Sequence, residues 1–520
     1  MKLRTIVKIA ITSSVVLLCS GFALYSFFRL SAAEGQKDFN LYELVPSTTS
    51  AVFVTDDVLE FVAEVDELTC SKNQQYLYVS KLFSYLKQSL YALSEDTPHG
   101  LSRQMNQMLI SFHEPDNERN QVLYCRLGNG DKELVNRFVR KYISSLYPPK
   151  TFIYKGEEII IYPMADGDFL ACYLTSDFMA LSFQKKLIEN VIDAYKSGKS
   201  LADDSTFTGI RAPKKSAAAA TIYTRMQGMM GWTEFDMKMK DDFIYFSGIT
   251  HDADTCFAFI NQLRQQQSVK GFPGEVLPST AFYFSRQGIT DWVSLLSYGN
   301  AQGQSVPART SEVQNRDKEF SRYLMENAGQ DLVACLFQRE DTLQGAAAVL
   351  SLSVADVTEA ERMLRALVNA ASADEGRRNP RITFCYTVNK AYPIYRLPQT
   401  TLFEQLTSFA EPTLDVYAAF YGGRLLLAPD ADALAHYIRQ LDKGEVLNGA
   451  MVYQTGMDHL SDSYHFMLMA DFDHIFQQSE NHVRFVPDFF LRNADFFRHF
   501  TLFVQFACAD AVSYTHLRAH

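Results

Sequence analysis

Two closely similar phrases lie far apart in the chain, Leu44-Val45-Pro46-Ser47-Thr48 and Val276-Leu277-Pro278-Ser279-Thr280. Each is followed by a short apolar stretch that favours a strand, Ala51–Val54 in the first case and Ala281–Phe284 in the second. A period of about 230 residues is typical of a tandem domain duplication, whereas solenoid repeats recur every ~20–50 residues. The phrase therefore marks the start of a duplicated module. We expect residues 44–270 to form a first module and residues 271–508 a second.

A second set of residues recurs after a predicted amphipathic helix in each module. Lys185–Lys196 and Asp432–Asp442 have the apolar spacing of such helices. The glycine that follows each helix is the residue that favours the left-handed conformation at a helix end. The residues that recur with equal spacing are Gly198, Leu201 and Phe207 in the first module and Gly444, Leu447 and Tyr453 in the second.

The strand pattern of each module predicts hairpins that alternate with single helices. Lys155-Gly156 and Gly422-Gly423 are typical hairpin turns. This pattern favours an α+β class with antiparallel sheets and helices on one face. Extra residues of the second module are expected in Ala373–Arg381 and Pro398–Pro412. Its closing hairpin is expected to lack the last strand, because only His499–Ala507 has a counterpart in the first module.

Composition places the chain among globular proteins. It has 520 residues, of which 47% are hydrophobic and 21% charged, and this length favours two or three domains. The net charge is −11 and no block of lysine and arginine stands out. Because phosphate neutralisation supplies most of the affinity for nucleic acids, a nucleic-acid partner is not expected.

The N-terminal end predicts a single membrane-spanning helix. Basic residues precede the uncharged stretch Ile9 to Phe28, which is long enough to cross about 30 Å of hydrocarbon. Residues 1–30 are thus expected to form a cytoplasmic tip and anchor, and residues 31–43 a spacer. The positive-inside rule places the N-terminus in the cytoplasm and the bulk of the chain in the periplasm, anchored to the inner membrane. A signal peptide cleaved after Ser31-Ala32-Ala33 is an alternative, and a lipoprotein modified at Cys19 is another.

The C-terminal end, Val512–His520, is unrelated to the sequence that precedes it. It resembles the translation of a sequencing adapter. Residues 509–520 are therefore expected to be an artefactual tail, with native sequence that ends near Cys508 in a protein that continues further.

No catalytic, metal or nucleotide motif occurs in the sequence, so no catalytic, cofactor-binding or metal residue is predicted. The glycines of Gly128-Asn129-Gly130 are interpreted as a loop. The cysteines lack metal-ligand spacing and several lie in apolar strand patterns, which favours small buried side chains, with a structural disulfide as the alternative. They are Cys19, Cys70, Cys125, Cys172, Cys256, Cys335, Cys385 and Cys508.

A few polar clusters have a functional alternative. Histidines and carboxylates gather at His459, His465, Asp471, Asp473 and His474, which are metal-ligand types, but the first module has no equivalents, so ordinary histidines are preferred. Asp203-Asp204 offers two carboxylates, yet adjacent loop residues are usually solvated. The basic pairs Lys214-Lys215 and Arg377-Arg378 are similarly interpreted as loop charges.

The N-terminal anchor, the Leu-Val-Pro-Ser-Thr opening and the phrase Gly198-Lys199-Ser200-Leu201 together resemble an uncharacterised family of envelope proteins. The family occurs in Gram-negative bacteria of the Bacteroides type and is known as a domain of unknown function. The resemblance covers most of residues 1–508 and implies an anchored envelope protein, without any activity or site residue.

These features favour a non-catalytic envelope protein that binds an unknown envelope partner through its surfaces. A groove between the two modules is the first place where a ligand is expected. The alternative is a periplasmic carrier or sensor of an apolar ligand such as a lipid, which requires a cavity of several hundred Å³ lined by Phe and Tyr. An enzyme is the third hypothesis, because polar residues from distant segments can meet in one cleft.

Overall fold

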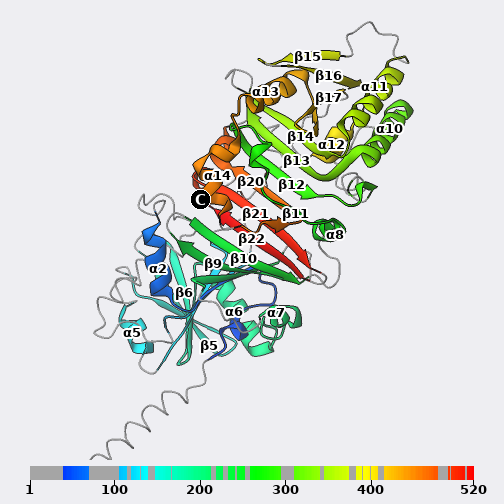
Figure 1. Cartoon of the computed structure of the whole chain (residues 1–520). Helices are drawn as coiled ribbons and strands as arrows, with labels where there is room; N and C mark the ends of the chain where they lie inside the picture. The colour runs from blue at the N-terminus through cyan, green and yellow to red at the C-terminus, as the bar shows by residue number, and fades with distance from the viewer. Residues whose placement is uncertain are drawn as a thin grey trace, which may run out of the picture.

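The structure is a computed structural model of the whole chain, shown in Figure 1. The residues that it describes are 39–68, 105–113, 119–128, 131–138, 147–164, 167–211, 218–225, 232–240, 243–251, 258–293, 295, 310–339, 345–373, 382–388, 390–398, 400–407, 415–458, 460–477, 486, 490–491, 494–509 and 512–519.

The first module contains eleven described strands and the helices between them. The elements are η1 (Leu41–Leu44), β1 (Ala51–Thr55), α2 (Val58–Glu67), β2 (Met108–Phe112), β3 (Gln121–Arg126), α5 (Asp131–Phe138), β4 (Lys150–Tyr154), β5 (Glu157–Pro163), β6 (Phe169–Leu174), β7 (Phe178–Ser182), α6 (Lys185–Ser197), α7 (Ser205–Ile210), β8 (Ala220–Thr224), β9 (Thr233–Lys240), β10 (Phe243–His251), α8 (Ala258–Arg264) and β11 (Val269–Lys270), the last of which pairs outside the main sheet.

The second half of the chain continues with a similar series. Its elements are η3 (Pro273–Glu275), β12 (Ala281–Gly288), α10 (Ser311–Asn327), β13 (Ala328–Gln338), β14 (Ala346–Val354), α11 (Val357–Ala373), β15 (Ile382–Tyr386), β16 (Ala391–Pro398), α12 (Leu402–Leu406), β17 (Asp415–Tyr421), β18 (Arg424–Ala428), α13 (Ala431–Asp442), η4 (Leu447–Gly449), α14 (Met451–Met457), β19 (Ser463–Tyr464), β20 (Phe466–Asp471), α15 (Phe472–Phe476), α18 (Ala494–Phe497), β21 (Thr501–Ala509) and β22 (Val512–Ala519).

One antiparallel sheet of 20 strands runs through both modules. The strand pairings give the order β4-β5-β6-β7-β3-β2-β1-β8-β9-β10-β22-β21-β20-β12-β13-β14-β18-β17-β16-β15. Read from its outer edge towards the centre, each half has its strands in the same order. The order β4-β5-β6-β7-β3-β2-β1-β8-β9-β10 in the first half corresponds strand by strand to β15-β16-β17-β18-β14-β13-β12-β20-β21-β22 in the second. The mixture of helices with antiparallel sheet confirms the α+β class.

The two halves meet at the centre, where β22 pairs with β10 on one side and with β21 on the other (Figure 1). The structure thereby corrects the expectation that the second module lacks the last strand of its closing hairpin, since residues 512–519 take that place. The backbones of β10 and β21 each present a row of N–H and C=O groups to the space between these two strands. An extended segment satisfies both rows through main-chain hydrogen bonds, whatever its sequence. That residues 509–520 are an artefactual tail stays a prediction.

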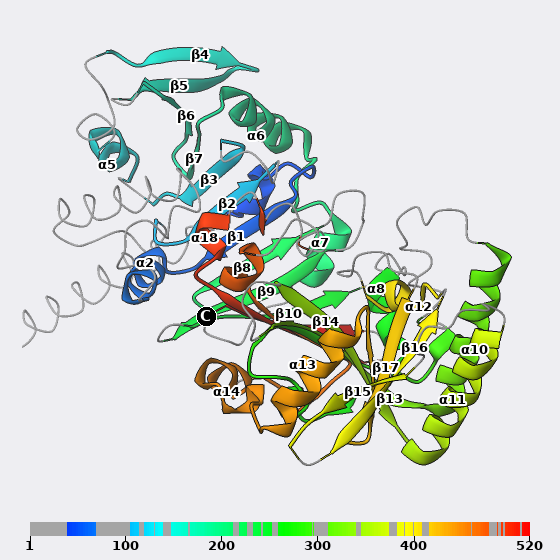
Figure 2. The same cartoon turned by 90° about the horizontal axis from the view of Figure 1, so that it is seen from above.

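Helices cover both faces of the sheet, so the expectation of helices on one face only is wrong (Figure 2). In the first module, α2 and α5 bury Phe61 and Val135 on one face, while α6 and α7 bury Ile188 and Phe207 on the other. The second module has α10 and α11 on one face and α13 and α14 on the opposite one. The cause is visible in strands such as β3, whose first five residues are all buried, because a strand that is apolar on both faces must be covered twice.

The opening phrase of each module pairs with the phrase that follows the amphipathic helix. Pro46 forms an antiparallel bridge with Ser200, and Pro278 forms the equivalent bridge with Val446. The amide of Leu201 donates to Val45 O at 2.9 Å, and the amide of Leu447 donates to Leu277 O at the same distance. The two recurrent phrases are therefore halves of one contact, which fixes the start of each module against its helix.

The glycines after these helices have the predicted conformation. Gly198 has φ of 63° and Gly444 has φ of 76°, both in the left-handed region. Hairpin turns at Lys155-Gly156 and Gly422-Gly423 are confirmed as well, with positive φ at all four positions.

Replacement of Gly198 with alanine is expected to lower the free energy of unfolding by about 1–2 kcal/mol, because only the backbone conformation opposes a Cβ there. No heavy atom lies within 4 Å of the position that the new methyl group would occupy, so a steric clash does not contribute. Gly209, exposed within α7 at ordinary φ, is the matched control, and Gly209→Ala is expected to stabilise by about 0.5–1 kcal/mol. Chemical denaturation of both variants measures the difference. Shifts of equal sign would contradict this explanation.

Several predictions fall outside the described residues. They include the anchor Ile9 to Phe28 and most of the loop Ala373–Arg381. Among the residues that the structure describes, no helix is long and apolar enough to span a membrane. The helix α10 (Ser311–Asn327) was not predicted, although the Thr310 side chain caps its N-terminus by accepting a hydrogen bond from the Val313 amide.

Candidate ligand pocket in the first module

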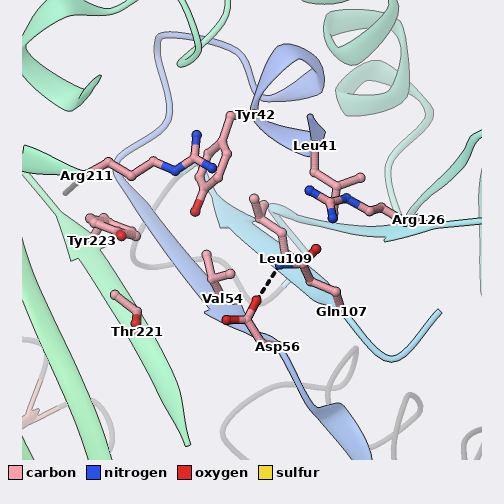
Figure 3. Close-up of a pocket in the computed structure, with 10 residues that line it drawn as sticks. All are labelled: Leu41, Tyr42, Val54, Asp56, Gln107, Leu109, Arg126, Arg211, Thr221 and Tyr223. Atoms are coloured by element: carbon pink, nitrogen blue, oxygen red, sulfur yellow. Dashed lines mark hydrogen bonds between the residues drawn. The ribbon is translucent and has the colours of Figure 1, made fainter. Parts of the chain in front are cut away.

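A pocket of about 270 Å³ opens on the α6 and α7 side of the first module (Figure 3). It lies beside the opening phrase, between η1 and the strands β1, β2, β3 and β8. Apolar and polar groups contribute about equally to its lining. The lining residues are Leu41, Val54 and Leu109 together with Tyr42, Asp56, Gln107, Arg126, Arg211, Thr221 and Tyr223.

The short helix η1 carries Tyr42 into the pocket wall. Asn40 caps this helix by accepting a hydrogen bond from the Tyr42 amide, and the Tyr42 carbonyl accepts one from the Ala202 amide at 3.3 Å. The guanidinium of Arg211, at the C-terminal end of α7, lies 4.1 Å from the centre of the Tyr42 ring. This cation–π contact holds an exposed arginine against a buried ring.

An aromatic cluster supports the wall from behind. The ring of Phe207 lies 5.2 Å from Tyr42, 5.1 Å from Tyr223 and 5.0 Å from Trp232, measured between ring centres. Phe207 is fully buried, as is its counterpart Tyr453 in the second module. The recurrent aromatic residue that the sequence singled out thus positions the two tyrosines of the pocket.

The charges of the pocket come from separate strands and turns. Figure 3 shows Arg211 beside Tyr42 on one side and Arg126, from the end of β3, on the other. Asp56, which follows β1, accepts a hydrogen bond from the Gln107 side chain. Thr221 donates to the carboxylate of Asp236 at 3.2 Å. Two guanidinium groups and one carboxylate therefore line the hollow.

Both tyrosines remain protonated in the physiological range. Burial raises the pKa of Tyr42 to about 12, although Arg211 partly offsets this effect. Burial also raises the pKa of Tyr223, and nearby Tyr42 adds to the rise. The phenolic groups are thus hydrogen-bond donors, and an arginine cannot be deprotonated in a protein. The pocket can therefore recognise a ligand group that accepts hydrogen bonds.

A buried polar chain continues from the pocket along β2. Ser111 lies two residues beyond Leu109, so both side chains share one face. Its hydroxyl lies 3.1 Å from the Tyr124 hydroxyl and 2.9 Å from His113 Nε2. Burial lowers the pKa of His113 to about 4, which keeps the imidazole neutral in the folded protein.

The low pKa of His113 predicts a pH-dependent stability. Between pH 6.5 and about 4 the unfolded chain binds a proton at this residue that the folded protein does not. The free energy of unfolding is therefore expected to fall as the pH is lowered through this window, by at most about 1.4 kcal/mol per pH unit from this group. Urea unfolding at several pH values measures the slope. The variant His113→Gln should show a shallower slope, and an unchanged slope would refute the assignment.

In the second module, the position in the sheet that corresponds to the pocket is filled by an ion cluster. The carboxylate of Asp331 lies 3.1 Å from Arg286 Nε and 3.3 Å from Arg424 Nη1. The carboxylate side chain is 9% exposed and the two arginines are each 14% exposed, so the cluster is largely withdrawn from water. Arg424 also donates to the Ser351 hydroxyl at 2.6 Å, and Arg286 donates to Gly271 O at 2.8 Å.

The polar clusters that the sequence indicated have structural roles. Asp471 caps α15, with its carboxylate accepting from the amides of Asp473 and His474, and it also contacts His474 Nδ1 at 2.9 Å. His465 Nδ1 accepts from the Cys508 amide at 3.1 Å. His459 lies outside the described residues, and among those described no three His, Cys, Asp or Glu side chains gather as metal ligands.

The paired aspartates also act locally, not as a dyad. Asp203 accepts from the Ser200 hydroxyl at 2.7 Å, and Asp204 caps α7 by accepting from the amides of Thr206 and Phe207. The pairs Lys214-Lys215 and Arg377-Arg378 lie outside the described residues, as do residues 129 and 130 of the glycine loop.

The cysteines that the structure describes form no disulfide bond, and most are buried. Burial raises the pKa of the thiols of Cys125, Cys172, Cys335 and Cys385, which keeps them protonated and unreactive. The interpretation as small buried side chains is confirmed for these four, and Cys508 is half-buried.

The pocket itself was not found from the sequence. Tyr42, Arg126 and Arg211 belong to segments that are far apart along the chain, and none stands in a motif. The nearest signal was the opening phrase, which begins two residues after Tyr42. The pocket also lies within the first module, whereas a groove between the modules was expected.

Comparison of the chain with protein-family models, with curated proteins and with solved structures finds no match.

Proposed function

We propose that this chain is a membrane-anchored envelope protein built by tandem duplication, with a non-catalytic binding role that is centred on the pocket of the first module. The anchor is Ile9 to Phe28, with the N-terminus in the cytoplasm and the modules in the periplasm. The equal order of strands in the two halves supports the duplication. The resemblance to envelope proteins of Bacteroides-type bacteria is consistent with this location.

The observation that carries the binding role is the lining of the pocket. Arg126 and Arg211 supply guanidinium groups, and Tyr42 and Tyr223 supply hydroxyl donors that stay protonated. Arg126 and Tyr223 belong to strands of the sheet, and a rigid strand holds a recognition group more accurately than a loop does. An apolar carrier finds less support, because only three of the ten lining side chains, Leu41, Val54 and Leu109, are aliphatic.

Purification of the full-length protein from native membranes tests this proposal. A polar small molecule or a specific envelope protein is expected to accompany the wild type, and bound small molecules are expected to be depleted in Arg211→Gln. Recovery of lipid alone would instead favour the apolar carrier. Protease treatment of spheroplasts tests the location, since the modules should be digested from the periplasmic side, and full protection would contradict it.

A further inference from the structure

The strand registers place the pocket and the ion cluster at the same position in the two modules. Val54 pairs with Leu109, and Arg286 pairs with Val333. Leu109 in turn pairs with Tyr124, and Val333 with Ser351. Val54 and Arg286 correspond because they follow Pro46 and Pro278, the prolines of the two opening phrases, at equal spacing.

Two residues further along each strand, the side chains differ in a specific way. Counted two residues from Leu109 and Val333, Gln107 in the first module matches Asp331 in the second, which pairs with Gly288. Counted two residues from Tyr124 and Ser351, Arg126 matches Ser353. Residues two apart on a strand face the same side, so these residues lie on the same face of the sheet as Leu109 and Val333. The second module therefore has a carboxylate at this position, whereas the first module has the amide of Gln107, which donates a hydrogen bond to the neighbouring Asp56.

The surroundings of that region are cationic in both modules. The Asp331 carboxylate is bound by Arg286 and Arg424. In the first module, Arg126 and Arg211 line a hollow, and the Tyr42 hydroxyl points into it (Figure 3). Guanidinium groups recognise carboxylates through short, charge-assisted hydrogen bonds.

We propose that the pocket of the first module binds the carboxylate of a small organic acid in the place that Asp331 fills in the second module. This inference rests on the proposed function, since it takes the pocket as the binding site. The acid carries a single charge, because Asp56 lies in the same pocket and repels a second one. Its short apolar part packs on Leu41, Val54 and Leu109.

Calorimetric titration of the full-length protein with butyrate tests the proposal. We expect one butyrate per chain, and binding that is weakened about tenfold or more by Arg211→Gln or by Arg126→Gln, since each removes a charge-assisted hydrogen bond. Arg365→Gln is the matched control. Arg365 also lies over a tyrosine ring, 5.7 Å from the centre of Tyr395, but it is far from the pocket in α11, so butyrate binding should not change.

Phosphate and butanol distinguish the remaining possibilities. Phosphate that binds as tightly as butyrate, with the same dependence on Arg211, would overturn the carboxylate class while leaving a binding role for the pocket. Butanol that binds as tightly as butyrate would overturn the role of the guanidinium groups. Butyrate binding that neither arginine variant changes would also overturn the inference. Because Arg211 is exposed, Arg211→Gln is expected to fold, and it decides the test if Arg126→Gln does not.

Discussion

Replacement of Asp331 with alanine is expected to destabilise the second module by about 3–5 kcal/mol, the loss that follows when one partner of a buried ion cluster is removed. Arg286 and Arg424 would then be left without the carboxylate that they share. Burial alone would raise the pKa of Asp331, but Arg424, the Ser353 hydroxyl and Arg286 hold it below the usual value. The carboxylate is therefore ionised in the folded protein.

Chemical denaturation monitored in the second module measures this effect. Asp415→Ala is the matched control, because Asp415 pairs with Arg396 at 2.7 Å on the surface and is 34% exposed. Exposed pairs contribute about 0–1 kcal/mol, so this variant should change little. Added formate is expected to restore part of the stability of Asp331→Ala and none of that of Asp415→Ala. An Asp331→Ala protein as stable as the wild type would show that the cluster is not a compensated ion pair.

Replacement of Phe207 with alanine is the second large change, with an expected loss of about 3–5 kcal/mol for a buried phenylalanine. Phe207 is 0% exposed and touches Tyr42, Tyr223 and Trp232. The loss should be accompanied by weaker butyrate binding, since the ring positions both tyrosines of the pocket.

Urea unfolding of the first module measures the change, with Phe169→Ala as the control. Phe169 is also a phenylalanine of the first module, but it is 58% exposed, so its truncation should cost about 1 kcal/mol or less. A loss of under about 1 kcal/mol at Phe207 would mean that the site collapses around the missing ring. The pocket would then not depend on this cluster.

The sequence predicted those parts of the fold that depend on local residue patterns. The opening phrase, the helix that ends at Gly198 and the turn at Gly422-Gly423 are each specified by neighbouring residues, and the structure contains them. The recurrence of Phe207 as Tyr453 was visible because the spacing after a helix is the same in the two halves of the chain.

The rest depends on contacts that no local pattern encodes. The second layer of helices follows from strands such as β3 and β13, which are buried on both faces, and such runs do not reveal how many layers cover them. The tail strand β22 is held by main-chain hydrogen bonds, and its residue types do little to specify this pairing. The pocket requires β1, β2, β3 and β8 to lie side by side before Arg126 and Arg211 can face one hollow.

The same region of the sheet is filled by an internal carboxylate in the second module and, as we propose, is open to an external one in the first. A crystal structure of the full-length protein grown with butyrate tests this central claim most directly. We predict one butyrate in the first-module pocket, with a carboxylate oxygen about 3 Å from a nitrogen of Arg126 or Arg211. Asp331 should still bind Arg286 and Arg424. A pocket that contains only water, with butyrate elsewhere or absent, would contradict the claim.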